Sequence, residues 1–113
     1  MKKYEIIAVD FDGTLCSDCY PDIGKPNLPL IELLKALKRE GCRIILWTCR
    51  CGRKLAQAVQ WCEEFGLEFD KVNRNTDEIL EKYGSDSRKI YADVYIDDKA
   101  CFPWEVMAYK KEE

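Results

Sequence analysis

The chain has 113 residues, with 18 Lys or Arg against 21 Asp or Glu, and therefore carries a net charge of -3. This length suits one domain with its own hydrophobic core, so we expect a single domain over residues 1–113. The acidic balance excludes the overall basic footprint of a nucleic-acid-binding protein. His is absent, which excludes a His-based catalytic triad and leaves carboxylates, Lys, Tyr and Cys to transfer protons.

Hydrophobic patterning predicts a cytoplasmic protein without a membrane partner. The sequence holds no apolar run long enough to cross a bilayer. The apolar run 6–9 near the N-terminus is too short for the core of a signal peptide, and it ends at Asp10.

The cysteines allow two interpretations. Seven is an odd number in a chain without secretory features, which favours reduced thiols that pack as small apolar residues. Two pairs nevertheless lie in loops beyond predicted strand ends, where zinc or disulfides could join Cys16, Cys19, Cys49 and Cys51. The Cys-x-Cys spacing of the second pair fits a zinc site poorly.

Apolar runs and turn residues alternate along the chain, which predicts strands and helices in turn. Strands are expected at 6–9, 42–47, 67–72 and within 90–96, whose later part 94–96 gives the strong strand. The run 67–72 is the weakest and belongs at the sheet edge. Helices are expected from Pro29 to a stop at Gly41, through 55–65 to a cap at Gly66, from Asn75 or Thr76 to Gly84, and around 103–107. This order predicts an α/β fold in three layers, α/β/α and Rossmann-like, with a small and mostly parallel sheet.

Polar side chains follow three of the predicted strands. Asp10 and Asp12 end the first strand, Thr48 follows the second, and Asp97 with Asp98 ends the last. Carboxyl ends of parallel strands meet at one edge of the sheet, where ligands bind, so we expect these side chains to meet. Clustered carboxylates repel one another unless a cation neutralises them, and oxygen ligands without His favour Mg²⁺. We therefore predict a magnesium site.

A phosphate group could be bound at the same edge. The helix that follows residue 53 begins there, and its free N–H groups could hold a phosphate together with Arg50 or Arg53. We favour Arg50 slightly, although a solvated surface arginine is the simpler interpretation of either. Gly13 relaxes the backbone beside the carboxylates and joins Arg50 among the candidate substrate-binding residues. With the metal reducing the charge on phosphate, Asp10 could attack phosphorus.

The segment Asp10-Phe11-Asp12-Gly13-Thr14, followed by Thr48, a Lys and Asp97-Asp98, resembles the motif set of the haloacid dehalogenase superfamily. The resemblance covers nearly the whole chain. It implies a magnesium-dependent phosphatase in which Asp10 becomes an aspartyl phosphate. It also implies that Asp12 protonates the leaving oxygen and later takes a proton from water.

The resemblance assigns the remaining roles residue by residue. Thr48 would hydrogen-bond the phosphoryl oxygens, and Lys89 would offset charge on the nucleophile and the phosphate. Asp97 and Asp98 would support magnesium beside the backbone carbonyl of Asp12. The lysine is the weakest of these assignments, because other basic residues lie near it in the sequence.

Two segments are too short for the cap domains that many members of this superfamily insert, namely the one after the first motif and the one at 73–76. We therefore expect an open site without a cap domain. Residues 16–27 or another subunit of a homo-oligomer could cover it, and the phosphorylated substrate could be a small molecule or a macromolecule.

Two other classes of protein compete with the phosphatase. A response-regulator receiver domain also combines an acidic pair, a phosphorylated Asp, a Thr and a Lys around magnesium. Receivers, however, place the acidic pair first and the acceptor Asp in mid-chain, whereas mid-chain here offers Thr48. An inactive binding protein is the second alternative, and the presence of both Asp10 and Asp12 argues against it. Dehalogenation and phosphoryl transfer to another acceptor stay open as minor variants.

Overall fold

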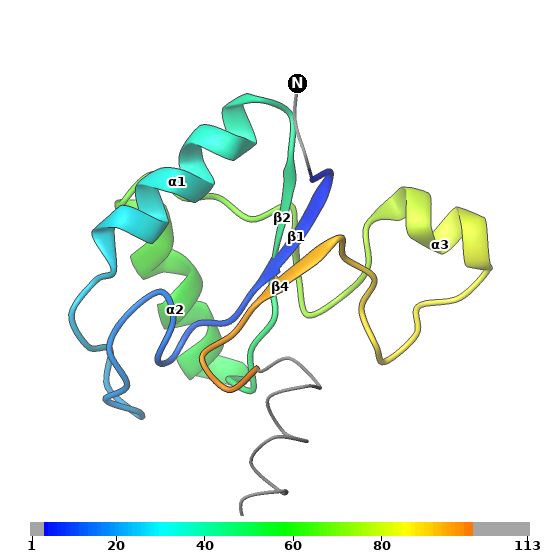
Figure 1. Cartoon of the computed structure of the whole chain (residues 1–113). Coiled ribbons are helices and arrows are strands. Elements are labelled where there is room, and N and C mark those ends of the chain that lie inside the picture. The colour runs from blue at the N-terminus through cyan, green and yellow to red at the C-terminus, as the bar shows by residue number, and fades with distance from the viewer. Residues whose placement is uncertain (1–3, 101–113) are drawn as a thin grey trace, which may run out of the picture.

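A parallel sheet of four strands in the order β3-β2-β1-β4 organises the computed structural model, which describes residues 4–100 (Figure 1). The elements in chain order are β1 (Ile6–Val9), α1 (Leu28–Arg39), β2 (Arg43–Leu46), α2 (Gly52–Glu64), β3 (Lys71–Val72), α3 (Asp77–Tyr83) and β4 (Val94–Ile96). The predicted Rossmann-like α/β fold is confirmed, and within 4–100 every strand pairing is parallel. The helix predicted around 103–107 lies outside the described residues.

The sheet lies between two helical layers, with α1 and α2 on one face and α3 on the other (Figure 1). β1 is accordingly buried and apolar on both faces. Ile7 and Val9 pack in a core with α1 and α2. Ile6 and Ala8 point the other way and pack with Ile79 of α3. Successive side chains of a strand alternate between faces, so an unbroken apolar run is what a central strand needs.

The helix ends follow the predicted local signals. Asn27 caps α1 by accepting a hydrogen bond from the Leu30 amide at 3.4 Å, and a proline occupies the first turn. Gly84 ends α3 in the left-handed conformation, with φ of 74°. Among residues 4–100, no helix is long and apolar enough to cross a membrane.

One edge strand is much shorter than predicted, and the other has the bounds expected of its strongest part. The run 67–72 pairs with β2 only at Lys71 and Val72, at the sheet edge as expected. The run 90–96 forms a strand over its later part, Val94–Ile96, as predicted, and Ile90 and Ala92 pack in the core around α3. Just before β4, the carboxylate of Asp93 accepts hydrogen bonds from the amides of residues 5 and 6 at the start of β1.

Candidate active site

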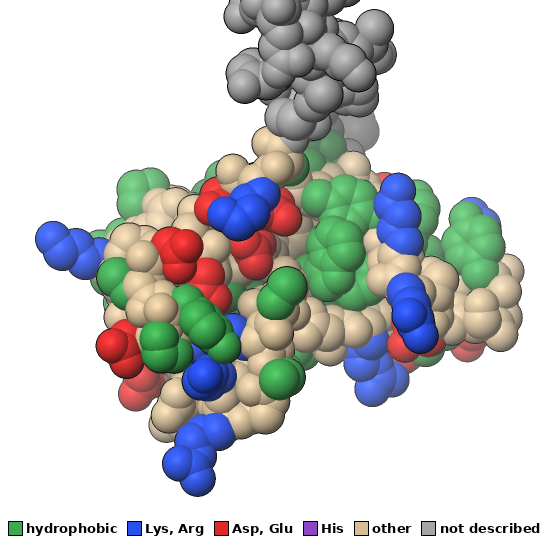
Figure 2. All heavy atoms as spheres, turned by 90° about the horizontal axis from the view of Figure 1, so that it is seen from below, with side chains coloured by type: hydrophobic (Ala, Val, Ile, Leu, Met, Phe, Trp, Pro, Cys, Tyr) green, Lys and Arg blue, Asp and Glu red, His purple; other side chains and the backbone are tan. Residues whose placement is uncertain are grey.

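A cleft of about 530 Å³ opens at the carboxyl ends of β1, β2 and β4. The residues that line it are Asp10, Asp12, Thr48, Arg50 and Asp97, which the sequence predicted, and Asp18, Tyr20, Trp47, Cys49 and Lys99, which it did not. Figure 2 shows acidic side chains gathered on the face seen from below, beside an apolar surface. The side chains predicted at the strand ends thus line one cleft, and the loops add further side chains to it.

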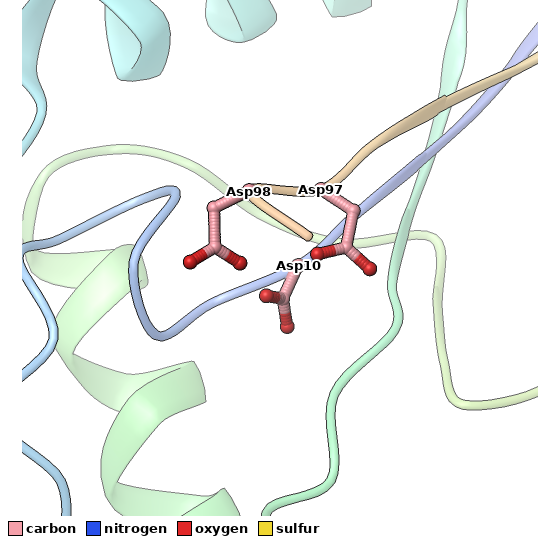
Figure 3. Close-up of side chains that lie close together, drawn as sticks. All are labelled: Asp10, Asp97 and Asp98. Carbon is pink, nitrogen blue, oxygen red and sulfur yellow. The ribbon is translucent and has the colours of Figure 1, made fainter. Parts of the chain in front are cut away.

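Asp10 and Asp97, which line this cleft, form an acidic cluster with the neighbouring Asp98 (Figure 3). One carboxylate oxygen of each lies within 4.8 Å of the others. The Asp10 amide donates to the Ile96 carbonyl at 2.9 Å, which holds the ends of β1 and β4 together. The pKa of Asp10 is raised from 3.8 to about 6, mainly by burial and also by the neighbouring charges of Asp97 and Asp98, against a backbone hydrogen bond that lowers it.

The turn after β1 is shaped to admit Asp98. Thr14 accepts a hydrogen bond from the Asp98 amide through its hydroxyl oxygen at 3.1 Å. Gly13 has a φ of +81°, and a Cβ there would lie 2.3 Å from an oxygen of the Asp98 carboxylate. Only glycine satisfies both the backbone conformation and the close approach. The structure thus gives Gly13 a part in building the cluster, while its predicted contact with substrate stays a prediction.

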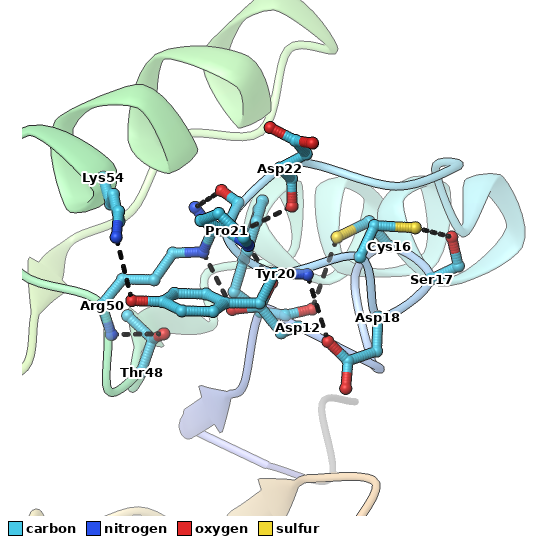
Figure 4. Close-up of polar contacts among 12 residues, drawn as sticks. Asp12, Cys16, Ser17, Asp18, Tyr20, Pro21, Asp22, Thr48, Arg50 and Lys54 are labelled. Atoms are coloured by element: carbon cyan, nitrogen blue, oxygen red, sulfur yellow. Dashed lines mark hydrogen bonds and ion pairs between the residues drawn. The ribbon is translucent and has the colours of Figure 1, made fainter.

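Asp12 does not join the acidic cluster and instead forms a two-pronged ion pair with Arg50 (Figure 4). The Arg50 Nε donates to Asp12 Oδ2 at 2.8 Å, and Nη2 donates to Oδ1 at 2.7 Å. The Arg50 side chain is 1% exposed and that of Asp12 is 20% exposed. Paired N–H donors that face both carboxylate oxygens fix the orientation as well as the distance.

The other contacts of Arg50 tie it to the loop over the cleft. Nη1 donates to the Pro21 carbonyl at 3.3 Å, and Nη2 donates to the Asp22 carbonyl at 3.0 Å. The guanidinium carbon lies 5.0 Å from the centre of the Phe11 ring and 5.1 Å from that of Tyr20. These contacts occupy the guanidinium, so the structure gives no support to the phosphate-binding role that the sequence suggested for Arg50.

Thr48 lies in the cleft at the end of β2, as predicted. Its hydroxyl oxygen accepts a hydrogen bond from the Arg50 amide at 3.2 Å, and its own amide donates to Asn73 Oδ1 at 2.8 Å. The hydroxyl hydrogen can still be donated into the cleft. The arrangement therefore suits a residue that hydrogen-bonds an anionic ligand.

Among the predicted catalytic residues, Lys89 does not line the cleft. It is exposed and lines a different cavity, of about 530 Å³, beside α3. The reason is that the chain enters β4 only at Val94, after residues 90–92 have packed with α3. Lys99 lies in the cleft instead, with its Nζ 3.7 Å from Asp98 Oδ2. Sequence reasoning missed Lys99, although its position directly after a carboxylate pair at a strand end was the available signal.

The six cysteines within residues 4–100 are free. Cys16, Cys42 and Cys62 are buried, and burial raises the pKa of Cys62 to about 12. Cys19, Cys49 and Cys51 are exposed. Among the described residues, the group whose ligand atoms converge is the acidic cluster, not the four cysteines considered for zinc. The thiols thus match the simpler interpretation, with three of them packed as small apolar side chains.

The acidic cluster fits a hard divalent cation. Its donors are carboxylate oxygens alone, which suit Mg²⁺ or Ca²⁺ and suit zinc or copper poorly. Two of its three members are exposed, so a hydrated ion can enter without disrupting the core. Asp97, Asp98 and Asp10 are the residues that would hold such an ion.

No protein-family model matches the chain, and a comparison with curated proteins found no match. A solved structure of a conserved protein from Bacteroides thetaiotaomicron is similar, with 40% sequence identity over 96% of this chain and 91% of that chain. The TM-score of the two structures is 0.75. The chain belongs to the same family as that conserved protein. The match supports the α/β fold across nearly the whole length and says nothing of an activity.

Proposed function

We propose that the chain is a magnesium-dependent phosphatase that hydrolyses a phosphomonoester through Asp10. The observation that carries the proposal is the acidic cluster, in which three carboxylates converge at the carboxyl ends of β1 and β4 and two of them line the cleft. The raised pKa of Asp10, about 6, reflects burial and repulsion that a bound cation would relieve. The resemblance to the haloacid dehalogenase superfamily supports the same chemistry.

The reaction would proceed in two displacements. When bound, Mg²⁺ would lower the negative charge that the phosphate presents to a carboxylate. A carboxylate oxygen of Asp10 attacks phosphorus, the bond from phosphorus to the leaving oxygen breaks, and Asp12 gives that oxygen its proton. Water then attacks the aspartyl phosphate and gives a proton to Asp12, so inorganic phosphate leaves and the Asp10 carboxylate is restored.

The remaining cleft residues have supporting roles in this proposal. Thr48 donates its hydroxyl hydrogen to a phosphoryl oxygen. Lys99 adds positive charge beside Asp98, in the place that sequence reasoning gave to Lys89. Since the cleft is open at the surface, the leaving group can be a small molecule or part of a macromolecule.

The test is hydrolysis of p-nitrophenyl phosphate by wild type and Asp10→Asn, each with magnesium and with excess chelator. Asparagine keeps the shape of the side chain and removes the nucleophile, so we expect a loss of about 10³-fold or more in kcat. Chelation should remove wild-type activity as well. Glu81→Gln, which removes one carboxylate from the exposed surface of α3, is the matched control and should retain full activity.

Two results would count against the proposal. Equal activity of Asp10→Asn and wild type would exclude Asp10 as the nucleophile. A stable phosphorylated Asp10 without turnover would favour a receiver-like phosphate acceptor instead.

A further inference from the structure

We infer that Arg50 is a positioning residue that holds Asp12 for the hydrolysis of the aspartyl phosphate and links Asp12 to the loop over the cleft. The inference rests on the proposed function and assigns Arg50 a different part from phosphate binding. Its basis is the geometry of one buried side chain that joins two separate segments of the chain.

Arg50 holds the Asp12 carboxylate in one orientation. Both carboxylate oxygens of Asp12 accept hydrogen bonds from Arg50, at 2.8 Å and 2.7 Å. The two bonds together resist rotation and displacement of the carboxylate group. One face of the guanidinium lies near the Phe11 ring, and Phe11 is fully buried in the core. The Asp12 carboxylate is thus held against the core of the domain rather than against solvent.

Arg50 also links Asp12 to the loop over the cleft. The same guanidinium donates to the carbonyls of Pro21 and Asp22, which lie in the loop that joins β1 to α1. The Tyr20 ring packs on it at 5.1 Å and also lines the cleft. A change in the loop near the bound substrate would therefore act on Asp12 through Arg50 (Figure 4).

This position of Asp12 serves the hydrolysis of the aspartyl phosphate. The water that attacks the aspartyl phosphate must lose a proton to Asp12 while the bond from phosphorus to Asp10 breaks. Proton transfer requires the acceptor oxygen within hydrogen-bond reach of that water, so a loosened Asp12 slows this displacement. An aryl leaving group departs without a proton, so with an aryl phosphate the first displacement does not need Asp12.

The experiment measures steady-state turnover of p-nitrophenyl phosphate and the fraction of covalently phosphorylated protein, found by mass spectrometry after acid quench. The variants are Arg50→Met, Arg50→Lys and Asp12→Asn. Lys54→Met is the matched control, because Lys54 contacts the same loop through the Tyr20 hydroxyl at 3.4 Å and does not touch Asp12.

We expect Arg50→Met and Asp12→Asn to accumulate phosphorylated protein and to lose at least about tenfold in kcat, with KM little changed. Arg50→Lys should accumulate it too, because an ammonium keeps the charge and loses the two-pronged geometry. Lys54→Met should behave as wild type. Hydrogen exchange of the amides of 17–25 should rise in Arg50→Met and not in Asp12→Asn, since the loop carbonyls lose their donor only in the former.

Three results would overturn the inference. A raised KM without phosphorylated protein would show that Arg50 binds phosphate. A lower kcat in the folded Arg50→Lys variant, without accumulation of phosphorylated protein, would show that Arg50 has a merely structural role. If the wild type shows no Asp10-dependent turnover, both the proposed function and this inference fail. That outcome can be told from the first two results, because both of those require an active wild type.

Discussion

Asp10 and Asp12 leave the same strand two residues apart and meet opposite electrostatic surroundings. Asp12 faces the buried guanidinium of Arg50, which satisfies both of its oxygens. Asp10 faces the carboxylates of Asp97 and Asp98. The charge of Asp12 is thus neutralised by a residue of the chain itself, whereas Asp10 lies beside two further negative charges. For the reaction proposed above, we expect the second position to be the one that binds a cation.

Lys99 does not remove this contrast. Within residues 4–100, the ion pair that reaches the cluster is that of Lys99 with Asp98, at 3.7 Å, and the Lys99 side chain is 81% exposed. Exposed ion pairs contribute about 0–1 kcal/mol because solvent and salt screen them. The Arg50 side chain is 1% exposed, so its pair with Asp12 is far less screened. The cluster therefore keeps most of its negative charge.

The largest effect is expected on stability. Replacing Asp by Asn at position 12 and at position 10 should change the free energy of unfolding in opposite directions. Asp12→Asn should lower the free energy of unfolding by about 2–4 kcal/mol, because the buried Arg50 loses its counter-charge. Asp10→Asn should raise it by about 1–2 kcal/mol at pH 8 without magnesium, because it removes a charge that is partly buried and is repelled by Asp97 and Asp98, the size being reduced by solvent screening of this partly exposed group. Urea unfolding of both variants and wild type measures the two changes.

The pH dependence of the Asp10 effect has a defined sign. Since the pKa of Asp10 is raised from 3.8 to about 6, the folded state binds the proton more tightly than the unfolded state. Its stabilising contribution is full below pH 3.8 and is lost as pH rises through about 6. The gain of Asp10→Asn over wild type should thus grow between these values, and saturating magnesium should abolish it. A destabilised Asp10→Asn at pH 8 would contradict the contrast.

A smaller effect is expected when the space for Asp98 is filled. Gly13→Ala places a methyl group 2.3 Å from the Asp98 carboxylate, at a φ of +81°. Gly84→Ala is the matched control, with a φ of +74° and nothing within 4 Å of the added atom. Both should lose about 1 kcal/mol of stability from the backbone conformation. Only Gly13→Ala should also weaken magnesium binding, measured by calorimetry, and equal affinities would show that Asp98 is not needed for the ion.

The sequence was sufficient for the features that depend on one strand or helix at a time. Unbroken apolar runs located the central strands, and Pro29 and Gly84 marked helix ends correctly. The rule that carboxyl ends of parallel strands share an edge brought Asp10, Thr48 and Asp97 to one cleft. Each of these inferences needs only local pattern and the order of the elements.

The partner of Asp12 and the course of residues 90–93 could not be predicted in the same way. Arg50 lies in a loop, and whether it faces a ligand, solvent or Asp12 depends on packing against Phe11 and the distant loop at 21–22. Ile90 and Ala92 alternate as a strand would, yet they fill the core around α3. Alternation alone does not distinguish a residue in a sheet from one packed over it.

The lysines provide the last and smallest test, because the motif resemblance and the structure assign them differently. Lys99→Ala should lower kcat/KM by a few-fold, since it removes an exposed charge 3.7 Å from Asp98, equivalent to about 0.5–1 kcal/mol. Lys89→Ala should leave kcat/KM unchanged, because Lys89 lines the cavity beside α3. If Lys89→Ala instead causes the larger loss, residues 90–93 must rearrange when substrate binds, and the sequence motif would be the better guide to the working site.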